Sequence, residues 1–478
     1  MNGAAPRLIL HLGLGSFHRA HQAVYLHRMI AAGNRSWVLA GGNIRPDMAD
    51  TIRALRAQSG AYTVETVAPD GQRRYELVTS LRTIVPYEPG LSPLIRIGAD
   101  PATRIVSFTV TEAGYYLDAR DRLDLMAPEV SADIAAARDG RAGTTIYAAI
   151  TAILRERRQL RSGKLTLLNC DNLRHNGERF REGLLRFIEP LDDGGLREWV
   201  EANTTCPNAM VDRITPRPTA AVRERVRAVI GWDDGAAVMG ESFIQWVIED
   251  DFCNGRPAWE QVGVEMVRSV TPYEEAKIRI LNATHSGIAW AGTLLDHRYI
   301  HEGVRDRRIR QLAFDYITDD VIPCLRPSPI DLGLYRDSVL ERFGNAALQD
   351  TNERVAMDGF AKIPGFIAPT IRERLARNES IASSAMLPAL FLALLQRWNR
   401  GELATSYEDQ AMDPAAARAI CNSVDPVASL CRDTVLWGPI AGDERLVHAV
   451  RDASRRVDEW AAYITAQTSN ADGGSVMN

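Results

Sequence analysis

Short apolar runs alternate with helical spacing through the first half of the chain. Four nearly continuous apolar runs occur, at residues 8–12, 37–40, 105–110 and 165–168. Such runs are typical of strands that are buried on both faces of a sheet. Residues 17–30 and 146–154 carry apolar side chains at helical spacing between them. This alternation predicts an α/β fold with a doubly wound parallel sheet. Residues 62–67 and 74–78 alternate around a turn and predict a hairpin beside that sheet.

The pattern changes near residue 271. Beyond this point strand-like runs nearly disappear, and helical spacing dominates residues 309–317, 386–398 and 446–464. A chain of 478 residues also exceeds the usual size of a single domain. The sequence therefore predicts a dinucleotide-binding domain of Rossmann type over residues 1–270. A mainly α-helical domain for substrate binding and catalysis is predicted over residues 271–478.

The first predicted strand ends in a glycine turn at Gly13 and Gly15. Glycines at this place let the backbone approach the pyrophosphate of a dinucleotide at the beginning of a helix. The fingerprint is incomplete, because His18 occupies the position of a third glycine, and a simple tight turn is the alternative. After the second strand, Asp47 would accept from ribose hydroxyls and favour NAD, whereas Arg45 would pair with a 2′-phosphate and favour NADP.

Polar residues follow two further predicted strands. Glu112 comes after the strand at residues 105–110, and Asn172 comes after the strand at residues 165–168. Ligands of doubly wound sheets bind beyond the carboxyl ends of the strands, so we expect both residues to line that crevice. A turn asparagine that contacts no ligand is the alternative for Asn172.

The stretch K-I-R-I-L-N-A-T-H at residues 277–285 places an amine, an amide and an imidazole on one predicted helix. At about 100° per residue, Lys277, His285 and Asn282 fall at roughly 0°, 80° and 140°, within one half of the helix circumference. Their neighbours are apolar, and burial lowers the pKa of a lysine toward the range in which its neutral amine accepts a proton. Glu274 is close enough on the helix to exchange a proton with Lys277. A snorkelling lysine, a capped asparagine and a core histidine are the alternatives.

Composition argues against several classes of partner. The net charge is -5, and the arginines are interspersed with acids. The chain therefore has neither the net positive charge nor the basic runs that would attract nucleic acid or anionic lipid. No apolar run is long enough to span a bilayer, and residues 1–7 lack the pattern of a secretion signal. We therefore expect a cytoplasmic protein without nucleic-acid or membrane partners.

Metal binding is not expected either. The 6 cysteines form no C-x-x-C pair, which favours scattered reduced thiols over disulfides or a zinc site. His297 and His301 are four residues apart, but the H-E-x-x-H order of a catalytic zinc site is absent. Without a metal to polarise an alcohol oxygen, the proton acceptor would be an amine, and Lys277 is the candidate.

The order of Lys277, Asn282 and His285 resembles the motif of the polyol-specific long-chain dehydrogenases, the mannitol dehydrogenase family. Four further blocks resemble this family in the same order: G-L-G-S-F-H-R-A-H-Q at residues 13–22, C-D-N at 170–172, V-D-R-I-T-P at 211–216 and R-V-A-M-D-G-F-A-K-I-P at 354–364. Within the family, residues 10–21, 41–45 and 110–118 most resemble the branch that acts on D-arabinitol.

The resemblance implies roles for the matching residues. Lys277 would act as the general base, and Asn172 and Asn282 would donate to the substrate oxygen as it gains negative charge. His285 would bind a substrate hydroxyl. The residues implied to contact the polyol are Arg354, Lys362 and Asp212, and those implied to bind the cofactor are Gly13, Gly15, Ser16, Phe17, Asn43, Asp47 and Glu112. Solvated surface charge is the alternative for Arg354 and Lys362, and an ion pair with Arg213 is the alternative for Asp212.

The activity implied by the resemblance is NAD-dependent oxidation of a secondary alcohol, D-arabinitol to D-xylulose, with NADP less favoured than NAD. Oxidation of mannitol to fructose and reduction of a uronate are the alternatives within the family. A non-catalytic protein that binds a dinucleotide and senses redox state is the alternative of a different class, but a sensor needs no proton acceptor such as Lys277. We expect a monomer or a weak oligomer.

Overall fold

The computed structural model describes residues 6–118 and 120–472, with side chains described for these residues except 112 and 461–472. The chain forms two compact units. The first unit ends at Thr271 and the second begins at Pro272, apart from the turn Pro69–Gly71, which groups with the second unit. Each unit has its own hydrophobic core, which in the first unit lies on both faces of a sheet.

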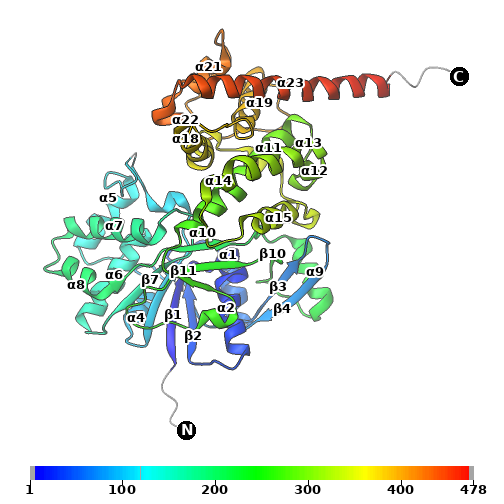
Figure 1. Cartoon of the computed structure of the whole chain (residues 1–478). Coiled ribbons are helices and arrows are strands. Elements are labelled where there is room, and N and C mark those ends of the chain that lie inside the picture. The colour runs from blue at the N-terminus through cyan, green and yellow to red at the C-terminus, as the bar shows by residue number, and fades with distance from the viewer. Residues whose placement is uncertain (1–5, 119, 473–478) are drawn as a thin grey trace. The chain divides into compact units, whose positions relative to one another are not determined.

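The main sheet of the first unit consists of six parallel strands in the order β5-β2-β1-β6-β7-β8 (Figure 1). These strands are β1 (Arg7–Leu12), β2 (Trp37–Gly42), β5 (Leu81–Val85), β6 (Thr103–Phe108), β7 (Leu165–Asn169) and β8 (Thr204–Thr205). Leu12 is paired with Gly42 on one side and with Phe108 on the other. The carboxyl ends of the three central strands therefore lie level with one another.

Alternate side chains of these strands enter two different cores. Leu10 of β1 and Val106 of β6 pack in one core with helices that lie between residues 92 and 203. Ile9 of β1 and Ile105 of β6 pack in the other core with helices that lie between residues 16 and 57 and with strands outside the main sheet. Because successive side chains of a strand point to opposite faces, this arrangement covers the sheet on both sides. The doubly wound α/β fold predicted from the sequence is confirmed.

The helices of the first unit are α1 (Ser16–Ala20), α2 (Gln22–Ala31), α3 (Ala49–Ala57), α4 (Ser92–Ala99), α5 (Pro128–Arg138), α6 (Ile146–Gln159), α7 (Asn176–Ile188), α8 (Leu196–Asn203) and α9 (Ala220–Ile230). Three short 3₁₀ turns are η1 (Glu112–Tyr115), η2 (Glu189–Leu191) and η3 (Trp259–Val262).

Two smaller sheets complete the first unit. In one, β3 (Tyr62–Val67) and β4 (Arg73–Val78) form the antiparallel hairpin that the sequence predicts, and β10 (Val238–Glu241) extends it in parallel to β3. In the other, β11 (Gln245–Glu249) lies between β12 (Glu265–Val267) and β9 (Ala209–Asp212).

The second unit is helical, and the bridge between Tyr299 and Thr351 is the only β pairing in its described part. Its α-helices are α10 (Thr271–Ala276), α11 (Ala283–Leu294), α12 (Ile300–Arg305), α13 (Arg307–Asp315), α14 (Ile322–Leu325), α15 (Leu332–Phe343), α16 (Asn352–Ala356), α17 (Gly359–Lys362), α18 (Ala368–Ala376), α19 (Met386–Arg400), α20 (Pro414–Cys421), α21 (Pro426–Cys431), α22 (Thr434–Trp437) and α23 (Glu444–Asp472). The remaining turns are π-helical at η4 (Lys277–Asn282), η5 (Tyr316–Val321) and η7 (Ile363–Ile367), and 3₁₀ at η6 (Ala346–Leu348) and η8 (Gly438–Ile440).

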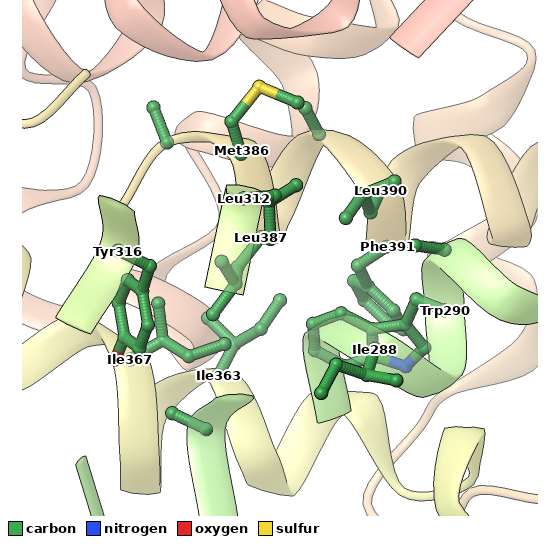
Figure 2. Close-up of a cluster of buried hydrophobic side chains, with 14 of the residues drawn as sticks. Ile288, Trp290, Leu312, Tyr316, Ile363, Ile367, Met386, Leu387, Leu390 and Phe391 are labelled. Atoms are coloured by element: carbon green, nitrogen blue, oxygen red, sulfur yellow. The ribbon is translucent and has the colours of Figure 1, made fainter. Parts of the chain in front are cut away.

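Helix α11 lies at the centre of the second unit. Its side chains are buried almost all round, which is expected of a helix without a polar face. Figure 2 shows Ile288 and Trp290 of α11 among Leu387, Leu390 and Phe391 of α19. The rings of Trp290 and Phe391 are 5.1 Å apart. This packing fixes the helix that carries the polar residues described below. In the part of the chain that the structure describes, no helix is long and apolar enough to cross a membrane.

Candidate active site

A pocket of about 250 Å³ lies beside the glycine loop of the first unit. It is lined by residues that follow β1, β2 and β6, among them Gly13, Gly15, Phe17, Asn43, Asp47 and Thr109. The strand order reverses between β1 and β6, and ligands of doubly wound sheets bind at that point. Ser16 begins α1 within the same loop. Glu112 begins η1 beside the lining residue Thr111, and its side chain lies outside the described part of the structure.

The two glycines of the loop have different reasons to be glycine. Gly13 has a φ of +109°, and a Cβ at this residue would lie 3.1 Å from the carbonyl oxygen of Thr109. A side chain there would be strained in conformation and in packing. Gly15 has an ordinary φ of -68°, and a Cβ there would meet no atom within 4 Å. Because Gly15 lines the pocket, its missing side chain leaves the pocket open.

Asn43 braces this loop. Its Oδ1 accepts a hydrogen bond of 2.8 Å from the amide of Leu14, and its Nδ2 donates to the carbonyl oxygen of Asp47 at 3.3 Å. The side chain is buried, so its bond with Leu14 joins the turn after β1 to the turn after β2, and its bond with Asp47 fixes the second turn. Asn43 therefore shapes the pocket that it lines.

The two residues on which the choice between NAD and NADP depends both line the pocket. Arg45 donates to the carbonyl oxygen of Thr144 at 3.2 Å and to the hydroxyl of Tyr116 at 3.1 Å. Asp47 is exposed. Arg45 is thus tethered by neutral acceptors, while the carboxylate of Asp47 faces solvent.

Two stacked imidazoles explain the incomplete glycine fingerprint. The rings of His11 and His18 are 3.5 Å apart and nearly parallel. His11 is fixed by Ser107 Oγ at 2.8 Å and by the carbonyl oxygen of Gly13 at 3.1 Å. Burial lowers the pKa of His11 to about 3 and that of His18 well below its usual value. Both rings are therefore neutral near pH 7, and His18 fills the place of the third glycine by stacking on β1.

Asn172 lies exposed in the turn after β7, next to a buried acid that the sequence reasoning missed. The carboxylate of Asp171 accepts a hydrogen bond of 2.7 Å from the hydroxyl of Tyr115, which accepts one of 2.5 Å from Asn169 Nδ2. Burial raises the pKa of Asp171 to about 7, although hydrogen bonds from the hydroxyl of Tyr115 and the side-chain amide of Asn176 oppose the shift. The only signal of Asp171 in the sequence is its position inside the C-D-N block, which does not reveal its burial.

Asp212 is the last residue of β9, and it is buried opposite Gln245 of β11. The guanidinium of the neighbouring Arg213 donates to the carbonyl oxygens of Ala20 and Glu241. Its charge is therefore stabilised by backbone carbonyls. Asp212 and Asn172 belong to the first unit, and the predicted residues that follow belong to the second.

Lys277 and Asn282 stand at the two ends of the π-helical turn η4. The angle of roughly 140° between them assumed a regular helix, and the structure corrects it. A π-turn bonds residues five apart instead of four, so it is wound more widely and the angle between its first and sixth residues is smaller. Lys277 and Glu274 are buried, and Asn282 is half-buried. Single π-turns within α-helices are frequent at functional sites.

Arg279 anchors this turn to the rest of the second unit. Its buried guanidinium forms ion pairs with Glu275 at 2.6 Å and with Glu373 of α18 at 2.7 Å. Its carbonyl oxygen accepts a hydrogen bond of 3.1 Å from the hydroxyl of Tyr316 in η5. The turn that carries Lys277 is thus held by ion pairs and by a neighbouring π-turn.

His285, Asp350 and Arg354 form a polar cluster. His285 Nε2 is 3.2 Å from Asp350 Oδ2, and Arg354 Nη2 is 2.5 Å from Asp350 Oδ1. The side chain of Asp350 is 10% exposed, whereas that of Arg354 is 68% exposed. The sequence reasoning predicted His285 and Arg354 but missed Asp350. The only signal in the sequence was an acid four residues before a predicted substrate-binding arginine.

Burial lowers the pKa of His285, and the charges of Arg354 and Lys362 add to this shift. Nζ of Lys362 donates to the carbonyl oxygen of Val355 at 2.7 Å, which links α17 to α16. Helix α17 begins at Gly359, where a Cβ would lie 2.0 Å from the ring of Phe391. Close packing against the core therefore positions Lys362.

Helices α16 and α11 are joined at a glycine. Asn352 of α16 is buried and donates to the carbonyl oxygen of His297 at 2.9 Å. A Cβ at Gly292 would lie 2.4 Å from Asn352 Nδ2, so only glycine admits this amide. Trp290 Nε1 adds a hydrogen bond of 3.0 Å to the carbonyl oxygen of Ala356. These contacts set the distance between Arg354 on α16 and His285 on α11.

Lysine usage is a sequence signal that supports the site. Of the 56 basic residues, only Lys164, Lys277 and Lys362 are lysines. Arginine remains charged in proteins, whereas the amine of lysine can become neutral. In a chain that uses arginine at nearly every basic position, two of the three lysines occur in the candidate site.

The described residues contain no group of three or more histidines, cysteines and acids that could hold a metal ion. His297 faces Asp306 at 3.7 Å, and His301 stacks on Tyr299 with ring centroids 5.4 Å apart. All six cysteines are free thiols.

Comparison with known families identifies both halves of the chain. The mannitol dehydrogenase Rossmann domain matches residues 7–261, and the mannitol dehydrogenase C-terminal domain matches residues 269–458. The chain belongs to the mannitol dehydrogenase family. The family recognised from the five sequence blocks is thereby confirmed.

Members of the mannitol dehydrogenase family resemble this chain along nearly its whole length. D-arabinitol 4-dehydrogenase of Ralstonia nicotianae is 59% identical over 96% of this chain and 98% of its own. D-arabinitol 4-dehydrogenase of Klebsiella pneumoniae is 52% identical over 93% and 96%. The structure of Pseudomonas fluorescens mannitol 2-dehydrogenase, a ternary complex with NAD and D-mannitol, is 31% identical, with a TM-score of 0.81 and coverage of 98% and 95%. The expected class of enzyme, a polyol dehydrogenase, is confirmed.

Proposed function

We propose that this protein oxidises a secondary hydroxyl of a sugar alcohol with NAD, and that it interconverts D-arabinitol and D-xylulose. The assignment of D-arabinitol as the substrate is supported by the 59% identity, over 96% of the chain, to a D-arabinitol 4-dehydrogenase. We also propose that residues 1–270 bind the dinucleotide and that residues 271–478 bind the polyol and supply the base. The protein is proposed to act in the cytoplasm as a monomer or weak oligomer.

The glycine loop of the first unit fits a nicotinamide dinucleotide. The open space at Gly15 and the close backbone packing at Gly13 suit a pyrophosphate at the beginning of a helix. A bound dinucleotide supplies the acceptor for the hydride. Asp47 favours NAD over NADP, because it accepts from ribose hydroxyls and repels a 2′-phosphate. The further residues proposed to contact the cofactor are Ser16, Phe17, Asn43 and Glu112.

Lys277 is proposed as the general base. In its neutral form, Nζ removes the proton of the substrate hydroxyl while the hydride leaves the same carbon. Lys277 is buried, and so are its neighbours Ile278 and Ile280. Glu274 is buried three residues earlier on the same helix, where it would pass the proton on.

Six other residues are proposed to act on the polyol. Asn172 and Asn282 donate N–H groups to the oxygen that gains charge, which lowers the barrier as an oxyanion hole does. His285, Arg354 and Lys362 bind the other hydroxyls, which the cluster around Asp350 supports. Asp212 is proposed as a further contact, supported only by its match to a family block.

Oxidation of D-mannitol to fructose is the second candidate, because a mannitol 2-dehydrogenase complex with D-mannitol has the same fold over 98% of this chain. The two candidates give different ketoses. Purified protein would be incubated with NAD and either polyol, and the products would be separated and identified. We expect NADH and D-xylulose from D-arabinitol. The absence of a ketose from every polyol would contradict the proposed function.

A further inference from the structure

Asp350 lies between two residues proposed to bind substrate. Its Oδ2 is 3.2 Å from His285 Nε2, and its Oδ1 accepts hydrogen bonds of 3.0 and 2.5 Å from Nε and Nη2 of Arg354. The ring of Phe343 stacks on His285 with centroids 4.7 Å apart. The carbonyl oxygen of Asp350 accepts from the amide of Ile300, which fixes its backbone. Nε2 of His285 and Oδ2 of Asp350 are both buried, and neither meets the geometry of a hydrogen bond with any described residue, so the 3.2 Å contact with the carboxylate is the interaction that acts on Nε2 of His285.

Asp350 and His285 each have a defined protonation state near pH 7. Burial would raise the pKa of Asp350, but His285 and Arg354 outweigh it and hold that pKa at about 2. Burial lowers the pKa of His285 below its usual 6.5, although Asp350 opposes the shift. The pair is therefore a carboxylate beside a neutral imidazole.

A neutral imidazole carries one N–H, and its neighbours decide which nitrogen bears it. A carboxylate only accepts hydrogen bonds, so its position at Nε2 places the proton on that nitrogen. Nδ1 then keeps a lone pair. Arg354 and Lys362 can only donate, which leaves Nδ1 of His285 as the acceptor among these three side chains. A hydroxyl that accepts from one of the cations can donate to Nδ1.

We propose that Asp350 is a positioning residue that fixes the tautomer of His285, so that Nδ1 accepts a hydrogen bond from a hydroxyl of the polyol. The proposal rests on the proposed function, since it needs a substrate with several hydroxyls. It assigns Asp350 no contact with substrate. The carboxylate acts through the imidazole.

The substitution Asp350→Asn tests this tautomer. The N–H groups of Arg354 would bind the amide oxygen of the new side chain, and this places its NH₂ against Nε2 of His285. That donor requires a lone pair on Nε2, so the proton moves to Nδ1. The hydroxyl would then be surrounded by donors. Asp306→Asn is the matched control, because Asp306 also lies between a histidine, His297, and an arginine, Arg308.

We expect Asp350→Asn to raise the KM for the polyol by about tenfold or more, as the loss of one hydrogen bond to substrate does, with a smaller change in kcat. NADH binding should be unchanged, and Asp306→Asn should behave as wild type. In a His285→Ala background, Asp350→Asn should add little, because both changes remove the same acceptor. An unchanged KM, or the same additional loss in the His285→Ala background, would overturn the proposal.

A second measurement does not depend on turnover. In protein with ¹⁵N-labelled histidine, we expect the NMR signals of His285, assigned with the His285→Ala variant, to show the proton on Nε2 in wild type. They should show it on Nδ1 in Asp350→Asn. A wild-type proton on Nδ1 would overturn the proposal whether or not the variant folds. If wild type oxidises no polyol, the proposed function fails, and the tautomer alone decides the role of Asp350.

Discussion

Lys277 is the one lysine proposed to act as a general base. It is buried on a π-turn, whereas Lys164 is exposed in the first unit. We expect Lys277→Ala to lower kcat by roughly 10²- to 10⁴-fold, the range of general-base assistance, because no other amine replaces Nζ. NADH affinity should stay within a factor of about two, since Lys277 lies outside the Rossmann domain. Turnover and fluorescence titration with NADH measure both, and Lys164→Ala should match wild type. Retained turnover in Lys277→Ala would refute the assignment.

Gly15 offers a test of the cofactor pocket that spares the fold. A Cβ at this residue meets no atom within 4 Å, so Gly15→Val should leave thermal unfolding nearly unchanged. The new side chain would occupy pocket space, and we expect the Kd for NADH to rise by about tenfold or more. Gly194→Val is the control, because its Cβ also meets no atom and it does not line the pocket. Normal NADH binding by Gly15→Val would mean that the dinucleotide binds elsewhere.

Single residues of the site were predictable where their chemistry is unusual for their surroundings. An amine, an amide and an imidazole in an apolar segment pointed to Lys277, Asn282 and His285. Asp350 and Asp171 were not predictable, because a single acid in a polar stretch resembles any surface charge. Their importance arises from burial and from partners distant in sequence, such as Tyr115 for Asp171.

Helix α16 is held against α11 by the fit between Asn352 and Gly292. We expect Gly292→Ala to displace Asn352 and so to destabilise the second unit by roughly 1–3 kcal/mol, the usual cost of overpacking. Because Arg354 lies two residues further along α16, the KM for the polyol should rise as well. Gly333→Ala in α15 is the control, since its Cβ makes ordinary contact at 3.4 Å. Thermal unfolding and steady-state kinetics measure the two effects. Wild-type values of both in Gly292→Ala would show that the contact between Gly292 and Asn352 does not position α16.

At the level of elements, the sequence predicted the parallel sheet, the hairpin and the helical second half. Strands buried on both faces and helices with one apolar side leave strong periodic signals. The π-turn at residues 277–282 left none, because the contacts that hold it, such as the ion pair of Arg279 with Glu373 of α18, join residues that are far apart in the sequence. Periodicity treats every helix as regular, so the angle between Lys277 and Asn282 was overestimated.

Asp171 contributes to the pH dependence of the free energy of unfolding, which is a property of the whole molecule. Its folded pKa of about 7 lies above its ordinary 3.8, so the folded protein keeps a proton that the unfolded chain loses between these values. The contribution to stability is fully present below pH 4 and is lost as the pH rises toward 7. In Asp171→Asn, the urea midpoint should fall less over this window than in wild type. The exposed Asp139→Asn is the control, and equal slopes in all three proteins would contradict the assignment.

The central claim for the molecule is that it oxidises the five-carbon polyol D-arabinitol in preference to the six-carbon D-mannitol. One hydroxymethyl group changes binding by only about 1 to 3 kcal/mol in a tolerant pocket, so the preference is a matter of degree. The direct measurement is the rate of NADH formation with D-arabinitol and D-mannitol side by side, reported as kcat/KM for each. We predict the higher value for D-arabinitol. A clear preference for D-mannitol would contradict the claim and would assign the protein to the mannitol-oxidising enzymes of its family.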